Sequence, residues 1–331
     1  MPIVLLERTD DREEIEAAAQ ALQGRADRRT PAMRRAMADV MRAGVAAVAG
    51  DLLERGLRDG DHVLVRSAIP ELSPGAIVPV VKADEKPPIE QLSDEIETVF
   101  TQGARYAVSF APRFDLVDDR AVQWARERAG RFLSDLDARA LANSREAVAW
   151  GIENGRTVAD TARYLRSTLY LPDRGMNAVE NYFNGLLDRV EKGDDLAEAA
   201  RHEASGRALS PRQFLDAQNI DTLVDRYADN WIKYTAKTTA RTMTIESSNA
   251  GLRTGWDQAA DAGLFDPATA TLVWYATNDD LVCPECAALN GTEVAFADGT
   301  WDVSLGVVEW PPAHPNCRCT LVLVTGRRGA T

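Results

Sequence analysis

Apolar residues recur at helical spacing through most of the chain up to about residue 262, which predicts a mainly helical body. Residues 10–57 carry two apolar stripes, separated by a break near Gly24 and Pro31. Between residues 118 and 187 the sequence carries four more apolar patterns, and the residues expected to cap helices there are Asp118 and Asp119, Ser144 and Thr157. Ser210 followed by Pro211 predicts a further helix start. The longest pattern runs from about residue 221 to residue 263, where two glycines and five threonines lower the helix propensity. We expect tight packing to offset that cost.

Two stretches depart from helical spacing. Residues 62–65 and 76–81 predict short strands, and the acidic, proline-containing residues 83–95 predict a linker. After residue 270, residues 271–276, 305–310 and 319–324 predict a small antiparallel sheet. Its expected core is formed by three tryptophans, Trp274, Trp301 and Trp310.

All four cysteines lie in two short runs near the carboxy terminus, Cys283 with Cys286 and Cys317 with Cys319. His314, one of three histidines, precedes the second pair. Two thiols separated by two residues bind one tetrahedral metal ion with little strain, and a second pair completes four ligands. The spacing predicts a structural zinc site ligated by the four cysteines. His314 either replaces one of them as a ligand or donates a hydrogen bond that orients a ligating thiolate.

Two other interpretations of the cysteines stay open at this point. Disulfides fit less well, because nothing in the chain is typical of a secreted protein, and unrelated buried thiols would not be expected to cluster.

A catalytic zinc would need an open position and a general base, which zinc deaminases supply as a glutamate two residues after the histidine. Pro315 and Asn316 follow His314 instead. We therefore expect a closed site, which can contribute ~10–16 kcal/mol of binding free energy to a small module.

These patterns together predict a mainly α fold in three parts. Residues 1–83 form an amino-terminal α+β segment that is helical and then contains short strands. Residues 84–262 form the helical body. Residues 263–331 form a small zinc-stapled α+β module.

The formal net charge of -13 argues against a dedicated nucleic-acid-binding protein, because phosphate contacts need clustered Lys and Arg. One region differs. Residues 25–42 contain six arginines and only two acids: Arg25, Arg28, Arg29, Arg34, Arg35 and Arg42 against Asp27 and Asp39. This region could contact phosphate or an acidic protein surface, but a solvated helix face is the simpler interpretation. No apolar run has the length of a membrane span, and the amino terminus is too short for a signal peptide.

A set of residues follows a characteristic order through the last third of the chain. It comprises Ala240-Arg241-Thr242, Glu246, Asn249, Gly251, Trp256, Gly263, Trp274, Asp280, Cys283, Cys286, Leu289, Gly291, Pro311, Pro312, His314, Pro315, Cys317, Arg318 and Cys319. This set resembles the phage head morphogenesis family, the minor head proteins similar to the F protein of phage Mu. The similarity covers roughly residues 140–325. Met243 stands where the family commonly has an acid, and residues 1–83 lie outside the similarity.

The resemblance implies a virion protein of a tailed phage or prophage. Family members are present in few copies, associate with the portal and are packaged inside the procapsid. The expected partners are the portal protein and the major capsid and scaffold proteins, with packaged DNA as a further candidate and no membrane. The expected location is the capsid interior, after assembly in the host cytoplasm.

Three functional hypotheses follow. The leading one is a non-catalytic protein that aids head assembly and DNA packaging or delivery. The second is a metal-dependent hydrolase or nuclease, for which Glu285 and Asp280 are the nearest acids in the sequence. The third is a DNA-binding packaging protein, which the acidic composition disfavours.

Overall fold

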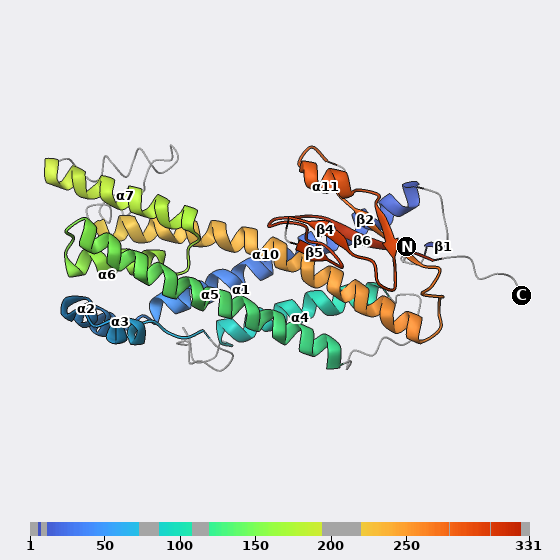
Figure 1. The fold of residues 1–331 in the computed structure, drawn as a ribbon, viewed down its shortest axis with the longest axis horizontal. Coiled ribbons are helices and arrows are strands. Elements are labelled where there is room, and N and C mark those ends of the chain that lie inside the picture. Colours follow the sequence, from blue (N-terminus) through green and yellow to red (C-terminus); the bar gives the residue numbers. More distant parts are fainter. Residues whose placement is uncertain are drawn as a thin grey trace, which may run out of the picture. The chain divides into compact units, whose positions relative to one another are not determined.

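The computed structural model describes residues 6–7, 12–72, 86–107, 119–193, 220–277, 279–304 and 306–325. It confirms a mainly helical protein with a small strand-containing module towards the carboxy terminus (Figure 1). The helices are α1 (Arg12–Ala46), α2 (Gly50–Asp59), α3 (His62–Ala68), α4 (Pro88–Ala107), α5 (Asp119–Glu153), α6 (Val158–Thr168), α7 (Asp173–Lys192), α10 (Ile220–Asp261) and α11 (Pro284–Leu289). None of the helices in these described ranges is both long enough and apolar enough to cross a membrane.

The chain forms two compact units, each built from segments that are distant in sequence. Unit 1 comprises residues 1–37, 89–129 and 236–331, and unit 2 comprises residues 38–88 and 130–235. The long helices α1, α5 and α10 each contribute residues to both units. The sequence-based division at residues 83 and 262 stays a prediction, and the first of these positions lies outside the described residues.

Unit 1 contains a four-stranded sheet in the order β1-β6-β2-β3. Its strands are β1 (Leu6–Glu7), β2 (Thr271–Tyr275), β3 (Glu293–Ala295) and β6 (Thr320–Thr325). β2 pairs antiparallel with β3 and β6, as expected for residues 271–276 and 319–324, with Trp274 opposite Leu321. β1 was not predicted, and it pairs parallel with β6. A separate ribbon joins β4 (Trp301–Val303) to β5 (Gly306–Val308), which lies within the predicted strand at residues 305–310.

The sheet and the helices of unit 1 share one apolar core. Leu22 of α1, Tyr106 of α4 and Trp256 of α10 lie in the same buried cluster as Trp274 and Trp301. The predicted tryptophan core is confirmed for Trp274 and Trp301, whereas Trp310 is only partly buried and packs against the cluster. The carboxy-terminal strands therefore do not fold around an apolar core of their own.

Glycine brings α4 and α10 into backbone contact within unit 1. A Cβ at Gly251 would overlap the carbonyl oxygen of Phe100, and a Cβ at Gly255 would lie 2.6 Å from the carbonyl oxygen of Ala104. Glycine is costly inside a helix, so close approach of the two backbones is the physical reason for both residues. The tight packing expected along the longest helix is present at these positions.

Unit 2 is all-helical in its described part. Trp150 of α5 packs with its ring centroid 4.5 Å from that of Tyr164 in α6 and 5.4 Å from that of Phe183 in α7. Asn143, 4% exposed, donates hydrogen bonds to the carbonyls of Thr168, Leu169 and Leu171. These carbonyls lie at and just beyond the end of α6, where a following helical turn would have to supply their N–H partners and none is present.

Some local predictions were right and others wrong. Thr157 caps α6 as expected, since its side chain accepts a hydrogen bond from the Asp160 N–H at 3.1 Å. Residues 62–65 belong to helix α3 rather than to a strand, because Asp61 caps the backbone N–H groups of Val63 and Leu64. The other predicted strand, residues 76–81, and a predicted helix start at residues 210–211 lie outside the described residues.

Three helix boundaries also differ from expectation. α1 continues through Gly24 and Pro31 without the predicted break, and α5 continues through Ser144. The Ser144 hydroxyl donates to the Leu141 carbonyl inside the helix instead of capping a new one. α4 begins at Pro88, inside the predicted linker at residues 83–95, because proline is well suited to a first helical position.

Candidate metal centre

Two turns of unit 1 present the cysteines. Cys283 is the N-cap of the short helix α11, and its sulfur accepts a hydrogen bond from the Cys286 N–H at 3.3 Å. Cys317 and Cys319 follow a cis Pro311–Pro312 peptide bond and precede β6. The Cys319 N–H donates to the Cys317 sulfur at 3.4 Å. Both turns thus direct a backbone N–H at a sulfur, an arrangement that favours the thiolate form.

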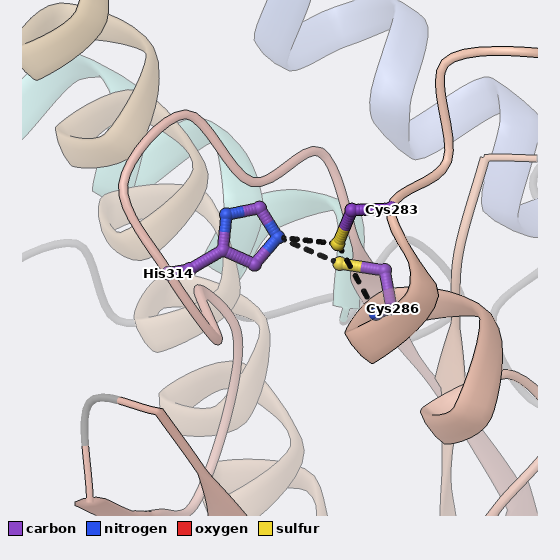
Figure 2. A group of neighbouring side chains, drawn as sticks. All are labelled: Cys283, Cys286 and His314. Carbon is purple, nitrogen blue, oxygen red and sulfur yellow. Dashed lines mark hydrogen bonds between the residues drawn. The ribbon is translucent and has the colours of Figure 1, made fainter.

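All five predicted donors come together in two overlapping groups. Cys283, Cys286 and His314 form one group, and Cys286, Cys317 and Cys319 form the other; the donor atoms of each group lie within 4.8 Å of one another. His314 Nε2 lies 3.1 Å from the Cys283 sulfur and 3.0 Å from the Cys286 sulfur (Figure 2). The Cys286 and Cys317 sulfurs are 3.8 Å apart. Cys286 is therefore the member common to both groups.

The histidine ring is held in the tautomer that suits a metal ligand. His314 Nδ1 lies 2.9 Å from the Pro315 carbonyl oxygen, which can only accept a hydrogen bond, so Nδ1 carries the proton. Nε2 then presents its lone pair to the two sulfurs, as Figure 2 shows. Burial lowers the pKa of His314, but the bond to Pro315 and the nearby Cys317 and Cys283 thiolates raise it above its usual value.

The buried thiols share negative charge unevenly. The hydrogen bond between Cys286 and Cys317 lowers the pKa of Cys317 and raises the pKa of Cys286. Burial raises the pKa of Cys283, but hydrogen bonds from Cys286 outweigh it and lower the pKa overall. Several thiolates this close repel one another without a cation between them. A divalent ion would remove that repulsion and stabilise all of them as thiolates.

The donor set fits zinc. Thiolate and imidazole are the ligands of structural zinc sites, and four of them satisfy a tetrahedral ion. The structure brings the five donors together, and ligation by Cys283, Cys286, Cys317, Cys319 and His314 stays a prediction. A bound zinc ion would supply charge neutralisation and link the two turns.

Helix α10 positions the second cysteine run through two polar residues. The Asn316 N–H donates to the Thr242 hydroxyl at 2.7 Å, while Asn316 adopts a positive φ of 67° that asparagine tolerates. Asn249, 1% exposed, accepts from the Leu321 N–H at 2.9 Å and from the Thr320 hydroxyl at 3.1 Å. Its amide also donates towards the Cys319 carbonyl at 3.4 Å. The helix thus fixes the chain on both sides of Cys317 and Cys319.

The acids near the cluster have structural partners or lie in solvent. Glu285 accepts a hydrogen bond from the Ser304 N–H at 2.6 Å, while Asp280 is exposed. Arg318 binds Asp279 through two hydrogen bonds of 2.5 and 2.6 Å. These bonds lower the pKa of Asp279 and raise the pKa of Arg318. No role was predicted for Asp279, although it lies only four residues before Cys283 in the sequence.

The region matched in the family comparison includes α10 and the cysteine turns. The family model described as Phage Mu protein F like protein matches residues 142–322, more than half of the chain. The chain belongs to the phage Mu protein F-like family. The predicted resemblance to phage head morphogenesis proteins is therefore confirmed. A comparison with curated proteins and one with solved structures each found no match.

The matched region includes both a long helix and the distant loop that this helix contacts. The matched region of this F-like protein begins in α5, ends in β6 and includes the five metal-donor candidates. Within it, Glu246 forms an ion pair with Arg128 at 2.7 Å. Thr242, Glu246 and Asn249 thus each bind a different segment of unit 1.

Proposed function

We propose that this F-like head morphogenesis protein is a minor virion component that associates with the portal inside the capsid and has no catalytic activity. The observation that carries the proposal is the family match, which spans residues 142–322 and contains the cysteine turns. The protein would assemble in the host cytoplasm with the portal, the major capsid protein and the scaffold protein. There it would aid head assembly and DNA packaging or delivery.

We further propose that one zinc ion per chain stabilises the carboxy-terminal sheet. Cys283, Cys286 and Cys317 would be ligands, and either Cys319 or His314 would complete the four. Three features support a structural role: the buried cysteines, the ordered backbone N–H donors and the histidine tautomer. Glu285, which an enzyme hypothesis would use as a general base, is bound to Ser304 N–H instead.

Co-expression with the portal protein of the same phage tests the proposed association. We expect the chain to co-purify with tagged portal and to be present inside purified procapsids at low copy number. Its presence in heads without any association with the portal would contradict the proposal. Retention by the tagged major capsid protein alone, in the absence of portal, would also contradict it.

The absence of catalysis is tested by incubating purified protein with DNA and added Zn²⁺, Mg²⁺ or Mn²⁺. We expect no cleavage above that of a mock purification. Metal-dependent cleavage that is abolished in Glu285→Gln would overturn the proposal. An Asp298→Asn variant, also in the carboxy-terminal region and outside the donor groups, controls for the loss of one carboxylate.

A further inference from the structure

The outward face of α1 in unit 1 carries a concentrated positive charge. Between residues 24 and 35, Arg25, Arg28, Arg34 and Arg35 are exposed, and Asp27 is the one acid in this stretch. The opposite face of the same stretch is apolar and buried through Ala26 and Met33. The burial pattern therefore places the four arginines at the surface, and we call them the arginine ridge.

The ridge is not neutralised within the described part of the chain. Arg25, Arg28, Arg34 and Arg35 form no ion pair with any described residue. Other arginines of this acidic protein are paired, including Arg128 with Glu246 and Arg253 with Asp257. Acids outnumber bases by 51 to 38, so acidic partners are plentiful along the chain. Four guanidinium groups without an ion pair to a described residue, within eleven residues of one helix, are unusual against that composition.

Helix α4 orders one edge of the ridge. The Arg25 guanidinium lies 4.1 Å from the centroid of the Tyr106 ring, and Arg29 Nε donates to the Gln102 side chain at 3.3 Å. A guanidinium held over an aromatic ring loses less conformational entropy when it binds an anion. At about 1.5 Å of rise per residue, Arg28 and Arg35 lie roughly 10 Å apart along the helix. Arg28 and Arg35 thus lie in line along the helix, while Arg25 and Arg34 flank them on opposite sides, so the ridge is an extended charged face rather than a single pocket.

The chemistry of the ridge selects its partner. Guanidinium groups bind phosphate oxygens in two-point contacts, and a row of them matches a repeating polyanion. Recognition of single strands relies on exposed aromatic side chains for base stacking. Residues 24–35 contain no aromatic residue, and Tyr106 is buried beneath Arg25. We propose that the arginine ridge of α1 binds the phosphate backbone of a nucleic-acid duplex without reading its sequence.

This proposal is independent of the portal association and of the metal. The overall negative charge is compatible with it, because electrostatic contacts act locally within a screening length of about 10 Å at 0.1 M salt. The acidic remainder of the protein would weaken binding rather than abolish it. We therefore expect an affinity that is measurable at low ionic strength and falls steeply with added salt.

The test is a fluorescence-anisotropy titration of the full chain with a short labelled DNA duplex over a series of salt concentrations. We expect the Arg28→Gln, Arg35→Gln double variant to reduce the slope of log K against log[salt] by about 1.8, at about 0.9 per phosphate contact. The matched control is Arg55→Gln, Arg58→Gln, which removes two exposed arginines from α2 with the same change in net charge. Circular dichroism verifies that both variants stay folded.

Three outcomes would overturn the proposal. The first is an equal loss of slope in both double variants, and the second is no duplex binding by the unaltered protein at low salt. The third is displacement of the duplex by poly-glutamate at the same concentration of charges as by unlabelled duplex, since this would indicate an acidic protein surface as the partner. Loss of binding in the ridge variant alone, with weak competition by poly-glutamate, supports a nucleic-acid duplex.

Discussion

Each of the two units buries an asparagine on a long helix, and the two residues differ in what they hold. Asn143 in unit 2 binds three carbonyls located 25 to 28 residues further along the chain. Asn249 in unit 1 binds Cys319, Thr320 and Leu321, located 70 to 72 residues further along the chain. Asn143 thus binds the end of helix α6, which is close in sequence, whereas Asn249 binds strand β6, which is distant in sequence.

The difference extends to the cores. In unit 2, aromatic residues of the successive helices α5, α6 and α7 pack against one another, and this packing involves apolar contacts between helices. The core of unit 1 combines α1, α4, α10 and the strands in one buried cluster, and the candidate metal donors Cys286, Cys317 and Cys319 belong to it. We infer that unit 2 depends mainly on apolar packing, whereas unit 1 also depends on a few polar and metal-binding contacts.

The largest expected effect comes from loss of the proposed zinc ion. Chelation would remove the ion, and Cys286→Ser would remove the donor common to both groups; either change would lose up to ~10–16 kcal/mol of apparent binding free energy. We expect β2 and β6 to lose protection in hydrogen exchange, together with the part of α10 that shares their core. We expect α6 and α7 of unit 2 to keep theirs.

Arg318→Gln is the control for this experiment, because it alters a residue next to two donors without removing a ligand atom. It should leave the zinc content at about one per chain. Full protection of β2 and β6 in the metal-free protein would show that the donors do not stabilise the sheet. Loss of protection limited to residues after 263 would instead favour a separately folding module.

The next largest effect is expected from the two asparagines. Asn249→Ala leaves the Leu321 N–H and the Thr320 hydroxyl without their partner, and each buried unsatisfied group costs about 1–3 kcal/mol. Asn143→Ala should destabilise the protein by a similar amount in urea unfolding. Only Asn249→Ala should also weaken metal affinity, measured by competition with a chromophoric chelator. Equal metal affinity in the two variants would mean that Asn249 does not position the cysteines.

Helix packing should give an effect of intermediate size. Gly251→Ala places a methyl group against the Phe100 carbonyl, and overpacking of this kind costs about 1–3 kcal/mol. Gly130→Ala is the matched control, since its added Cβ would meet nothing within 4 Å. The control should be stabilised by up to about 1 kcal/mol through helix propensity. Thermal unfolding that shifts both variants in the same direction would contradict close packing as the reason for Gly251.

Local patterns in the sequence predicted those elements that have a regular apolar spacing or a capping side chain. The helical span of α10 and the Thr157 cap follow from residue spacing and capping chemistry. The donor cluster was also predictable, because cysteine spacing constrains metal geometry strongly. The helix at residues 62–68 was mispredicted, because its short valine-rich run has the composition of a strand and the Asp61 cap decides otherwise.

Contacts between distant segments could not be predicted in the same way. Nothing in the spacing of residues 6–7 indicates that they pair with β6, and nothing near Asn249 indicates that its amide binds the chain after Cys319. Pro31 predicted a break, but α1 continues past it with Met33 and Met37 completely buried. In each case tertiary packing overrides a local preference.

The smallest expected effect is a dependence of unit 2 on acidic pH. Burial raises the pKa of Asp229, but hydrogen bonds from Arg42 and Lys233 outweigh it and lower the pKa overall. A carboxylate whose folded pKa is depressed contributes stability above its unfolded pKa of 3.8, and this stability is lost as pH falls through the lower folded pKa. Because the side chains of Arg42 and Asp229 are 41% and 35% exposed, we expect at most about 1 kcal/mol.

Urea titrations followed by NMR of α6 and α7 amides, recorded from neutral pH down past 3.8, measure this contribution in unit 2. They keep it separate from any acid-dependent loss of the proposed zinc ion in unit 1. Asp229→Asn should flatten the acid limb of the stability curve. Asp59→Asn, at an exposed carboxylate that forms no ion pair with a described residue, should leave it unchanged. If both variants keep the full acid limb, the Arg42–Asp229 pair does not stabilise unit 2. In that case its pH dependence must come from other carboxylates, of which Asp160 is the first to test, because its pKa is also lowered overall.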